Sequence, residues 1–173
     1  KLTGQDCVRS VQDALELGYT HIDTAQIYGN HQEVAEVIKD YERDKLWITS
    51  KVWRDQLDYK QVHKACQEIL EELDVEYLDL LLIHWPNTAV DMNETLQALV
   101  ELRDAGKIKN LGVSNFAIKH LEDVEKYHDD ISTNQVEYHA LLNQEELLEY
   151  CEDRGITITA YAPLAHGRLI NHE

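Results

Sequence analysis

Six strand-like segments of this 173-residue sequence end in residues whose side chains could do chemistry. These residues are Asp23, Lys51, His84, Ser114 with Asn115, Gln135 and Tyr161. One more candidate, Tyr28, follows Asp23 by five positions. A strand end chosen for packing alone could be Val, Ala or Gly, so this coincidence indicates a functional site.

The types of the first candidates indicate proton transfer. A lysine ammonium beside a tyrosine phenol favours the phenolate and lowers the phenol pKa from its reference value of about 10, toward a value useful for proton donation near neutral pH. We therefore expect Lys51 to lower the pKa of Tyr28, and Asp23 to pair with Lys51 and hold its charge in place. A neutral His84 could donate a hydrogen bond to a substrate carbonyl oxygen and orient it beside the Tyr28 hydroxyl.

The segments that must position these residues alternate between helical and strand-like patterns. Helical spacing of apolar residues covers 5–18, 31–40, 59–75, 93–107, 118–127 and 144–155. Strand-like runs cover 20–25, 46–52, 77–85, 109–116, 132–139 and 157–164. This alternation predicts an α/β fold with a parallel sheet and right-handed crossovers.

Two architectures have this alternation, an open doubly wound sheet and a closed (β/α)8 TIM barrel. Doubly wound nucleotide binders use a glycine-rich first turn, and neither G-x-G-x-x-G nor G-x-x-x-x-G-K-[ST] occurs here. We therefore expect a TIM barrel with about six of its eight βα units present, residues 1–173 forming a single, partial barrel domain. A barrel gathers the carboxyl ends of its strands into one ring, so the candidate residues can converge.

The composition limits the partners. Lys and Arg number 16 against 33 Asp and Glu, and the formal net charge of -17 disfavours binding to nucleic acid or to an anionic membrane. The acidity fits either an ordinary solvated surface or adaptation to high salt. No run approaches the roughly 18 apolar residues that a membrane span needs.

The cysteines indicate a reducing compartment. Cys7, Cys66 and Cys151 are widely spaced and form no C-x-x-C pattern, so we expect free, largely buried thiols and a cytoplasmic protein. His63 and Cys66 have the spacing of helical metal ligands, but no second pair of ligands joins them. The sequence therefore predicts no metal site.

Six segments, in this order, resemble the successive signatures of the aldo-keto reductase superfamily. They are GYTHIDTAQIYGN, ITSKVW, LLLIHWP, GVSNF, NQVEYH and AYAPL. The resemblance runs over essentially the whole chain. It implies a barrel enzyme that reduces small aldehydes or ketones with hydride from a nicotinamide cofactor, usually NADPH, with NADH also possible.

The resemblance also implies a role for each catalytic candidate. Tyr28 matches the general acid, Asp23 and Lys51 match the residues that tune it, and His84 matches the residue that orients the carbonyl group. Trp53 and Trp85 fall where the family lines its substrate pocket, beside His84.

The last three motifs match the family's cofactor site. Ser114, Asn115 and Gln135 match the positions that hold the nicotinamide carboxamide. Tyr161 matches the aromatic residue that stacks on the nicotinamide ring, and Leu164 is expected beside it.

Some positions depart from the family's pattern. The family often has Glu where this chain has His31, and we expect that a surface role has moved to the nearby Glu33. Ala162 replaces a common Ser, which removes one expected hydrogen bond to a cofactor phosphate. The family's first and last strands and its basic adenosine-phosphate motif lie outside residues 1–173. We therefore expect a chain clipped at both ends, and the choice between NADPH and NADH stays open.

Two other functions stay open beside the reductase. A regulatory protein of the same fold could bind the cofactor and sense its redox state. An inactive remnant is the other alternative, because an open six-stranded sheet leaves two unpaired edges. The sequence determines neither the carbonyl substrate nor the oligomeric state.

Overall fold

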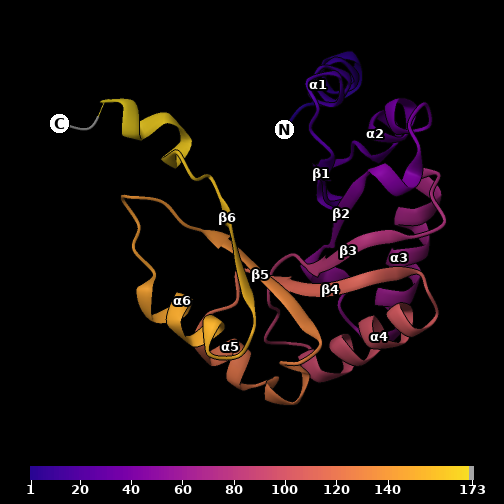
Figure 1. Cartoon of the computed structure of the whole chain (residues 1–173). Coiled ribbons are helices and arrows are strands. Elements are labelled where there is room, and N and C mark those ends of the chain that lie inside the picture. The colour runs from indigo at the N-terminus through magenta and orange to yellow at the C-terminus, as the bar shows by residue number, and fades with distance from the viewer. Residues whose placement is uncertain (172–173) are drawn as a thin grey trace.

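Six parallel strands form one sheet in chain order. The computed structural model describes residues 1–171 (Figure 1). The strands are β1 (His21–Asp23), β2 (Trp47–Val52), β3 (Leu78–Ile83), β4 (Ile108–Ser114), β5 (Ile131–Glu137) and β6 (Thr157–Tyr161). Each strand pairs with its neighbours in sequence, in the order β1-β2-β3-β4-β5-β6, whereas a doubly wound sheet reverses its strand order part-way. The predicted barrel class is therefore confirmed, as a half-barrel of six strands.

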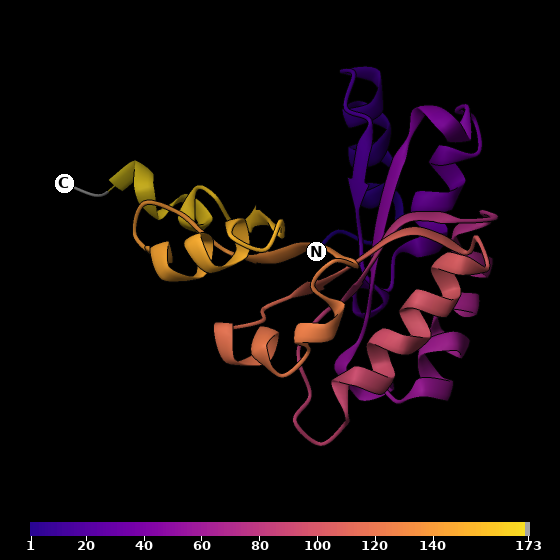
Figure 2. The same cartoon turned by 60° about the horizontal axis from the view of Figure 1, so that its bottom comes forward.

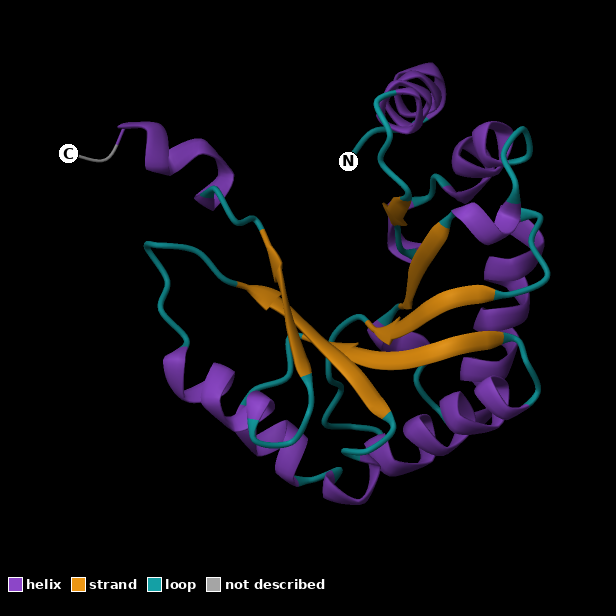
Figure 3. Ribbon diagram, in the orientation of Figure 1, coloured by secondary structure: helices purple, strands orange, loops and turns teal. Residues whose placement is uncertain are grey.

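The helices lie on the convex side of this curved sheet (Figure 3). They are α1 (Gly4–Glu16), α2 (His31–Ile38), α3 (Tyr59–Leu73), α4 (Met92–Asp104), α5 (Ile118–Glu122) and α6 (Glu145–Glu152). Helix α1 precedes β1, and each later helix joins two consecutive strands. The amino-terminal and carboxyl-terminal parts of the chain lie at opposite ends of the sheet (Figures 1 and 2). Within residues 1–171, no helix is long and apolar enough to cross a membrane.

The early ends of two predicted elements have a clear structural cause. Helix α5 ends at Glu122 and resumes as a 3-10 turn, Glu125–Tyr127, because Val124 leaves helical geometry and is fully buried in the core. Strand β6 ends at Tyr161 because Ala162 turns the backbone into the left-handed region, with φ 48°. A 3-10 segment, Ala165–Asn171, follows it.

The hydrophobic core lies between the sheet and the helices. The outward-facing residues Ile48, Leu81 and Leu111 are all 0% exposed, because α-helices cover this face. All three cysteines are free and buried, as predicted, and burial raises the pKa of Cys66 to about 11.

A buried carboxylate fixes the amino-terminal end of the sheet. Asp79, the one charged residue of β3, is 3% exposed. It accepts hydrogen bonds from the Ile48 amide (2.9 Å), Arg43 (2.7 Å) and Lys109 (3.1 Å). Burial alone would raise the pKa of Asp79, but these hydrogen bonds outweigh it and hold the pKa below its ordinary value. Asp79 thereby joins β3 to β2, to β4 and to the loop before β2.

Replacing Asp79 should weaken the fold and change its acid sensitivity. Asp79→Asn should lower the free energy of unfolding by roughly 1 to 3 kcal/mol at neutral pH, because a charged acceptor of three bonds is lost. Since the pKa of Asp79 is lowered, its stabilising effect is present above its ordinary pKa of about 4 and is lost as the pH falls through the lowered value. Urea unfolding at neutral and acidic pH should therefore show the two proteins converging in acid. Equal stability at neutral pH would contradict the role given to Asp79.

Gly112 marks a close approach between β4 and its neighbours. An added Cβ would lie 2.7 Å from the Thr133 carbonyl oxygen and 2.8 Å from Leu82 Cδ2. Gly112→Ala should therefore destabilise the fold by roughly 1 to 3 kcal/mol, as overpacking does in tight cores. The urea midpoint measures this loss. An unchanged midpoint would show that β4 can move away from its neighbours without a cost in stability.

Candidate active site

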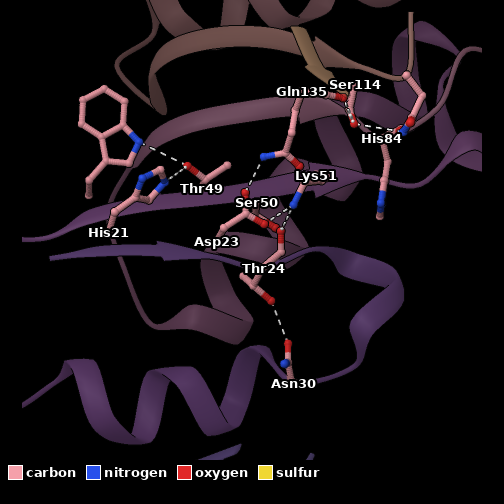
Figure 4. A network of polar contacts seen from close by, with 12 residues as sticks. His21, Asp23, Thr24, Asn30, Thr49, Ser50, Lys51, His84, Ser114 and Gln135 are labelled. Carbon is pink, nitrogen blue, oxygen red and sulfur yellow. Dashed lines mark hydrogen bonds and ion pairs between the residues drawn. The ribbon is translucent and has the colours of Figure 1, made fainter. Parts of the chain in front are cut away.

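The carboxyl ends of β1, β2 and β5 meet at an ion pair between the buried Lys51 and the partly exposed Asp23 (Figure 4). The Lys51 ammonium donates hydrogen bonds to Asp23 Oδ1 and to the Thr24 carbonyl oxygen, the latter at 3.0 Å. Gln135 Nε2 donates to the other oxygen of Asp23 at 2.8 Å, across 112 positions of sequence. In a flat sheet, β1 and β5 would lie roughly 19 Å apart, so the curvature of the sheet makes this contact. The predicted pairing of Asp23 with Lys51 is present.

Lys51 is held away from water. The residue is 1% exposed, whereas the Asp23 side chain is 34% exposed. Burial lowers the pKa of Lys51, and the charge and hydrogen bond of Asp23 act in the opposite direction. The ammonium is therefore a positive charge fixed in place by two acceptors.

Tyr28 lies on a short loop above this pair. It ends the 3-10 turn Gln26–Tyr28, and Gly29 follows in the left-handed region with φ 62°, where glycine meets no steric penalty. The Lys51 Nζ atom is 5.4 Å from the centroid of the Tyr28 ring. Lys1 Nζ lies 4.2 Å from the same centroid.

The predicted lowering of the Tyr28 pKa is wrong for this structure. The pKa of Tyr28 is raised, first by burial and then by the negative charge of Asp23. Lys51 directs its hydrogen bonds to Asp23 and Thr24, and among the described residues no bond joins it to the Tyr28 hydroxyl. The phenol therefore keeps its proton at neutral pH.

His84 lies between two aromatic rings. Its ring centroid is 5.7 Å from that of Tyr28 and 5.3 Å from that of Trp53, both in edge-to-face geometry. Burial lowers the pKa of His84 to about 4, and the positive charges of Lys51 and Lys1 add to this effect. The imidazole is thus neutral at physiological pH, as predicted. Its Nδ1 atom is buried and finds no hydrogen-bond partner within residues 1–171.

The remaining strand-end residues form a cluster of hydroxyl and amide groups. Ser114 Oγ donates to the Gln135 carbonyl oxygen at 2.7 Å. Asn115 Nδ2 donates to the His84 carbonyl oxygen at 2.9 Å and to Ser114 Oγ at 3.0 Å. Asn115 Oδ1 accepts from the Tyr161 hydroxyl at 2.9 Å.

This cluster suits a planar carboxamide group. A carboxamide needs both donors and acceptors, and Ser114, Asn115 and Gln135 supply one hydroxyl and two primary amides. The ring of Tyr161 lies at the edge of the same cluster and offers an aromatic face. The donor set therefore fits a nicotinamide.

The matching family agrees with this geometry. The model of the Aldo/keto reductase family matches residues 1–173. The chain belongs to this family.

Among its curated relatives, the Glyoxal reductase of Bacillus subtilis is 42% identical over 173 residues, covering 98% of this chain and 62% of that protein. The Methylglyoxal reductase DkgB of Salmonella typhimurium is 38% identical over 172 residues, covering 96% of this chain and 64% of that protein. The crystal structure of MGS-M4, an aldo-keto reductase enzyme from a Medee basin deep-sea metagenome library, superimposes with a TM-score of 0.92 at 37% identity and covers 98% of this chain and 64% of that one. The chain thus spans a little under two thirds of the length of these reductases.

Three further positions named in the sequence analysis lie outside this group of contacts. Trp53 lies against His84, but Trp85 is 41% exposed, and no described contact brings its ring to Tyr28 or His84. Leu164 follows the end of β6 and is 66% exposed, outside the amide cluster. His31 is 2% exposed and so has no surface role, while Glu33, to which that role was expected to have moved, accepts the Gly4 amide at the surface.

Sequence reasoning missed three groups at this site. Thr24 holds Lys51 through its carbonyl oxygen, and its hydroxyl donates to Asn30 Oδ1 at 2.7 Å, closing the loop that carries Tyr28. Polar residues on both sides of Tyr28 were a readable signal for such a closure. Lys1 carries no sequence signal, because only the fold brings it over the Tyr28 ring.

The imidazole of His84 should titrate far below an ordinary histidine. We expect a midpoint of about 4, against about 6.5 for a free side chain, measured by NMR of ring nitrogens and assigned with His84→Asn. Because the fold favours neutral His84, its contribution to stability is present above the ordinary pKa and is lost as the pH falls through the lowered one. A midpoint near the ordinary value would mean that water reaches the ring.

Proposed function

We propose that this chain forms part of the barrel domain of a nicotinamide-dependent oxidoreductase that reduces small aldehydes or ketones to alcohols. The observation that carries the proposal is the convergence of Asp23, Lys51 and Gln135 beneath Tyr28 and His84. Membership of the aldo/keto reductase family supports it.

Tyr28 would act as the general acid. Its phenol is neutral at physiological pH, so the hydroxyl can donate its proton to the carbonyl oxygen of the substrate as that oxygen becomes an alkoxide. The phenolate left behind would be stabilised by the Lys51 ammonium, whose position Asp23 and the Thr24 carbonyl oxygen fix. In a buried site this attraction is stronger than in water.

His84 would orient the substrate. A neutral imidazole can donate one hydrogen bond without competing for the proton of Tyr28, and its edge-to-face contact with Tyr28 places both groups at one side of the site. Trp53 would supply an apolar wall beside the carbonyl group, with Trp85 at the exposed rim.

Ser114, Asn115 and Gln135 would hold the nicotinamide carboxamide of NADPH, or of NADH, and Tyr161 would lie against the ring. When bound, the reduced nicotinamide supplies a hydride to the carbonyl carbon. Asn115 now bonds to Tyr161, and Gln135 to Asp23, so both amides would exchange an internal partner for the cofactor.

The substrate class we propose is small dicarbonyl compounds. Two relatives that cover most of this chain carry the names glyoxal reductase and methylglyoxal reductase. A cytoplasmic location agrees with three free, buried cysteines.

Tyr28→Phe tests the proposal, with the exposed Tyr19→Phe as a matched control (Tyr19 is 67% exposed). Oxidation of NADPH by methylglyoxal should slow by roughly 100-fold or more, because the proton donor is lost. The Kd for NADPH, followed by tryptophan fluorescence, should change by less than about twofold, since the phenol is not among the proposed carboxamide ligands. Undiminished turnover would overturn the assignment of Tyr28. Tight NADPH binding without turnover in the unaltered chain would instead favour the redox-sensing alternative.

A further inference from the structure

His31 is a buried histidine that the proposed mechanism leaves without a role. It is the first residue of α2, three positions after Tyr28, and its side chain is 1% exposed. Its Nδ1 atom lies 2.7 Å from Glu72 Oε2, and its Nε2 atom lies 3.0 Å from Ser50 Oγ. Both ring nitrogens of His31 therefore have partners.

The charges fix which atom of each pair donates. A carboxylate only accepts, so Nδ1 of His31 carries the proton that is given to Glu72. Burial lowers the pKa of His31 despite the hydrogen bond and charge of Glu72, which favours the neutral ring. In that form Nε2 accepts, and the Ser50 hydroxyl donates to it.

This chain of groups joins three elements. His31 begins α2, Ser50 lies on β2, and Glu72 lies in the last turn of α3. Side chains alternate along a strand, so Ser50 faces the helices while the next residue, Lys51, faces the inside of the half-barrel. The bond from His31 thus fixes β2 at the residue next to the buried ammonium.

The same bond also restrains the loop of Tyr28. Gly29, between Tyr28 and the start of α2, has a left-handed conformation and provides no side chain to hold the loop. On the α2 side of Gly29, the side chains of the next two residues restrain the loop: Asn30 accepts the Thr24 hydroxyl next to β1, and His31 bonds to Ser50 on β2. Tyr28 lies three positions before His31, and Lys51 directly follows Ser50. The His31–Ser50 hydrogen bond therefore links the loop of Tyr28 to the strand of Lys51.

The order Glu72, His31, Ser50 is that of an acid, a base and a nucleophile, but a hydrolytic role is excluded by access. Ser50 is 0% exposed, so no substrate reaches its oxygen. The three residues therefore act by holding α2, β2 and α3 together.

We propose that Glu72, His31 and Ser50 form a clamp that holds Tyr28 at its working distance from Lys51, which makes His31 a positioning residue for proton donation. This inference rests on the proposed function, since the distance matters only if Tyr28 donates a proton to substrate. Errors of about 1 Å in such placement can cost roughly 100-fold in rate.

The test uses His31→Leu and Ser50→Ala, alone and combined, in the full chain. The pKa of Tyr28 is read by NMR of ¹³Cζ-labelled tyrosine and assigned with Tyr28→Phe, while urea unfolding measures stability separately. The matched control is His63→Leu, which breaks another His–Glu pair, His63 with Glu101 at 3.5 Å, on the far side of α3 from the clamp.

We expect the clamp variants to lower the raised pKa of Tyr28 toward its ordinary value, because a loosened loop admits water. Turnover should fall by roughly tenfold with little change in the KM for the carbonyl compound. Glu72→Gln keeps an acceptor for Nδ1 and should preserve both quantities. His63→Leu should change neither.

Two results would overturn the clamp. One is a loss of stability in both His31→Leu and Ser50→Ala while the pKa of Tyr28 stays unchanged, which would show that His31 serves only the packing of the core. The other is a shift of equal size in His63→Leu. If the unaltered chain shows no turnover, the proposed function fails, but the NMR measurement still decides whether His31 positions Tyr28. If His31→Leu does not fold, Ser50→Ala, which removes one hydroxyl, gives the same readout.

Discussion

The burial of the Lys51 ammonium is the constraint on which this structure depends. A lysine is almost never fully buried unless its charge is paired, because the loss of water costs several kcal/mol. Here the compensation comes from Asp23 on β1 and from the Thr24 carbonyl oxygen, and Gln135 on β5 in turn holds Asp23. Gln135 can reach Asp23 only if the sheet curls, since β1 and β5 are separated by three other strands. The Asp23–Lys51 pair joins neighbouring strands, whereas its third member, Gln135, is supplied by the curvature of the half-barrel.

The two ends of the sheet use buried charge differently. At the amino-terminal end, Asp79 is enclosed by Arg43, Lys109 and a backbone amide, and the result is a closed structural network. At the carboxyl-terminal end, Asp23 and Tyr28 remain partly exposed, and His84 keeps a buried nitrogen without a partner among the described residues. In (β/α)8 barrels, residues at the amino-terminal end of the strands serve stability and residues at the carboxyl-terminal end serve function. The polar groups of this chain follow that division.

The electrostatics of Tyr28 combine two opposing requirements. Burial and Asp23 keep the phenol protonated, which preserves the proton that a general acid must deliver. The nearby Lys51 would favour the phenolate once that proton has left. The distance between phenol and ammonium decides the balance, and that distance is set by the loop through Gly29, Asn30 and His31 rather than by either residue alone.

The sequence by itself determined the elements, the parallel sheet and the identity of the strand-end residues, because the periodicity of apolar residues and the alternation of helices and strands can be read along the chain. It also predicted the pairing of Asp23 with Lys51, since a buried ammonium needs a carboxylate. Only the tertiary structure decided that the Tyr28 pKa is raised, that Trp85 and Leu164 lie at exposed positions and that His31 is buried between Glu72 and Ser50. These outcomes depend on distance and on exclusion of water between elements that are far apart in sequence, and spacing along the chain carries no information about either.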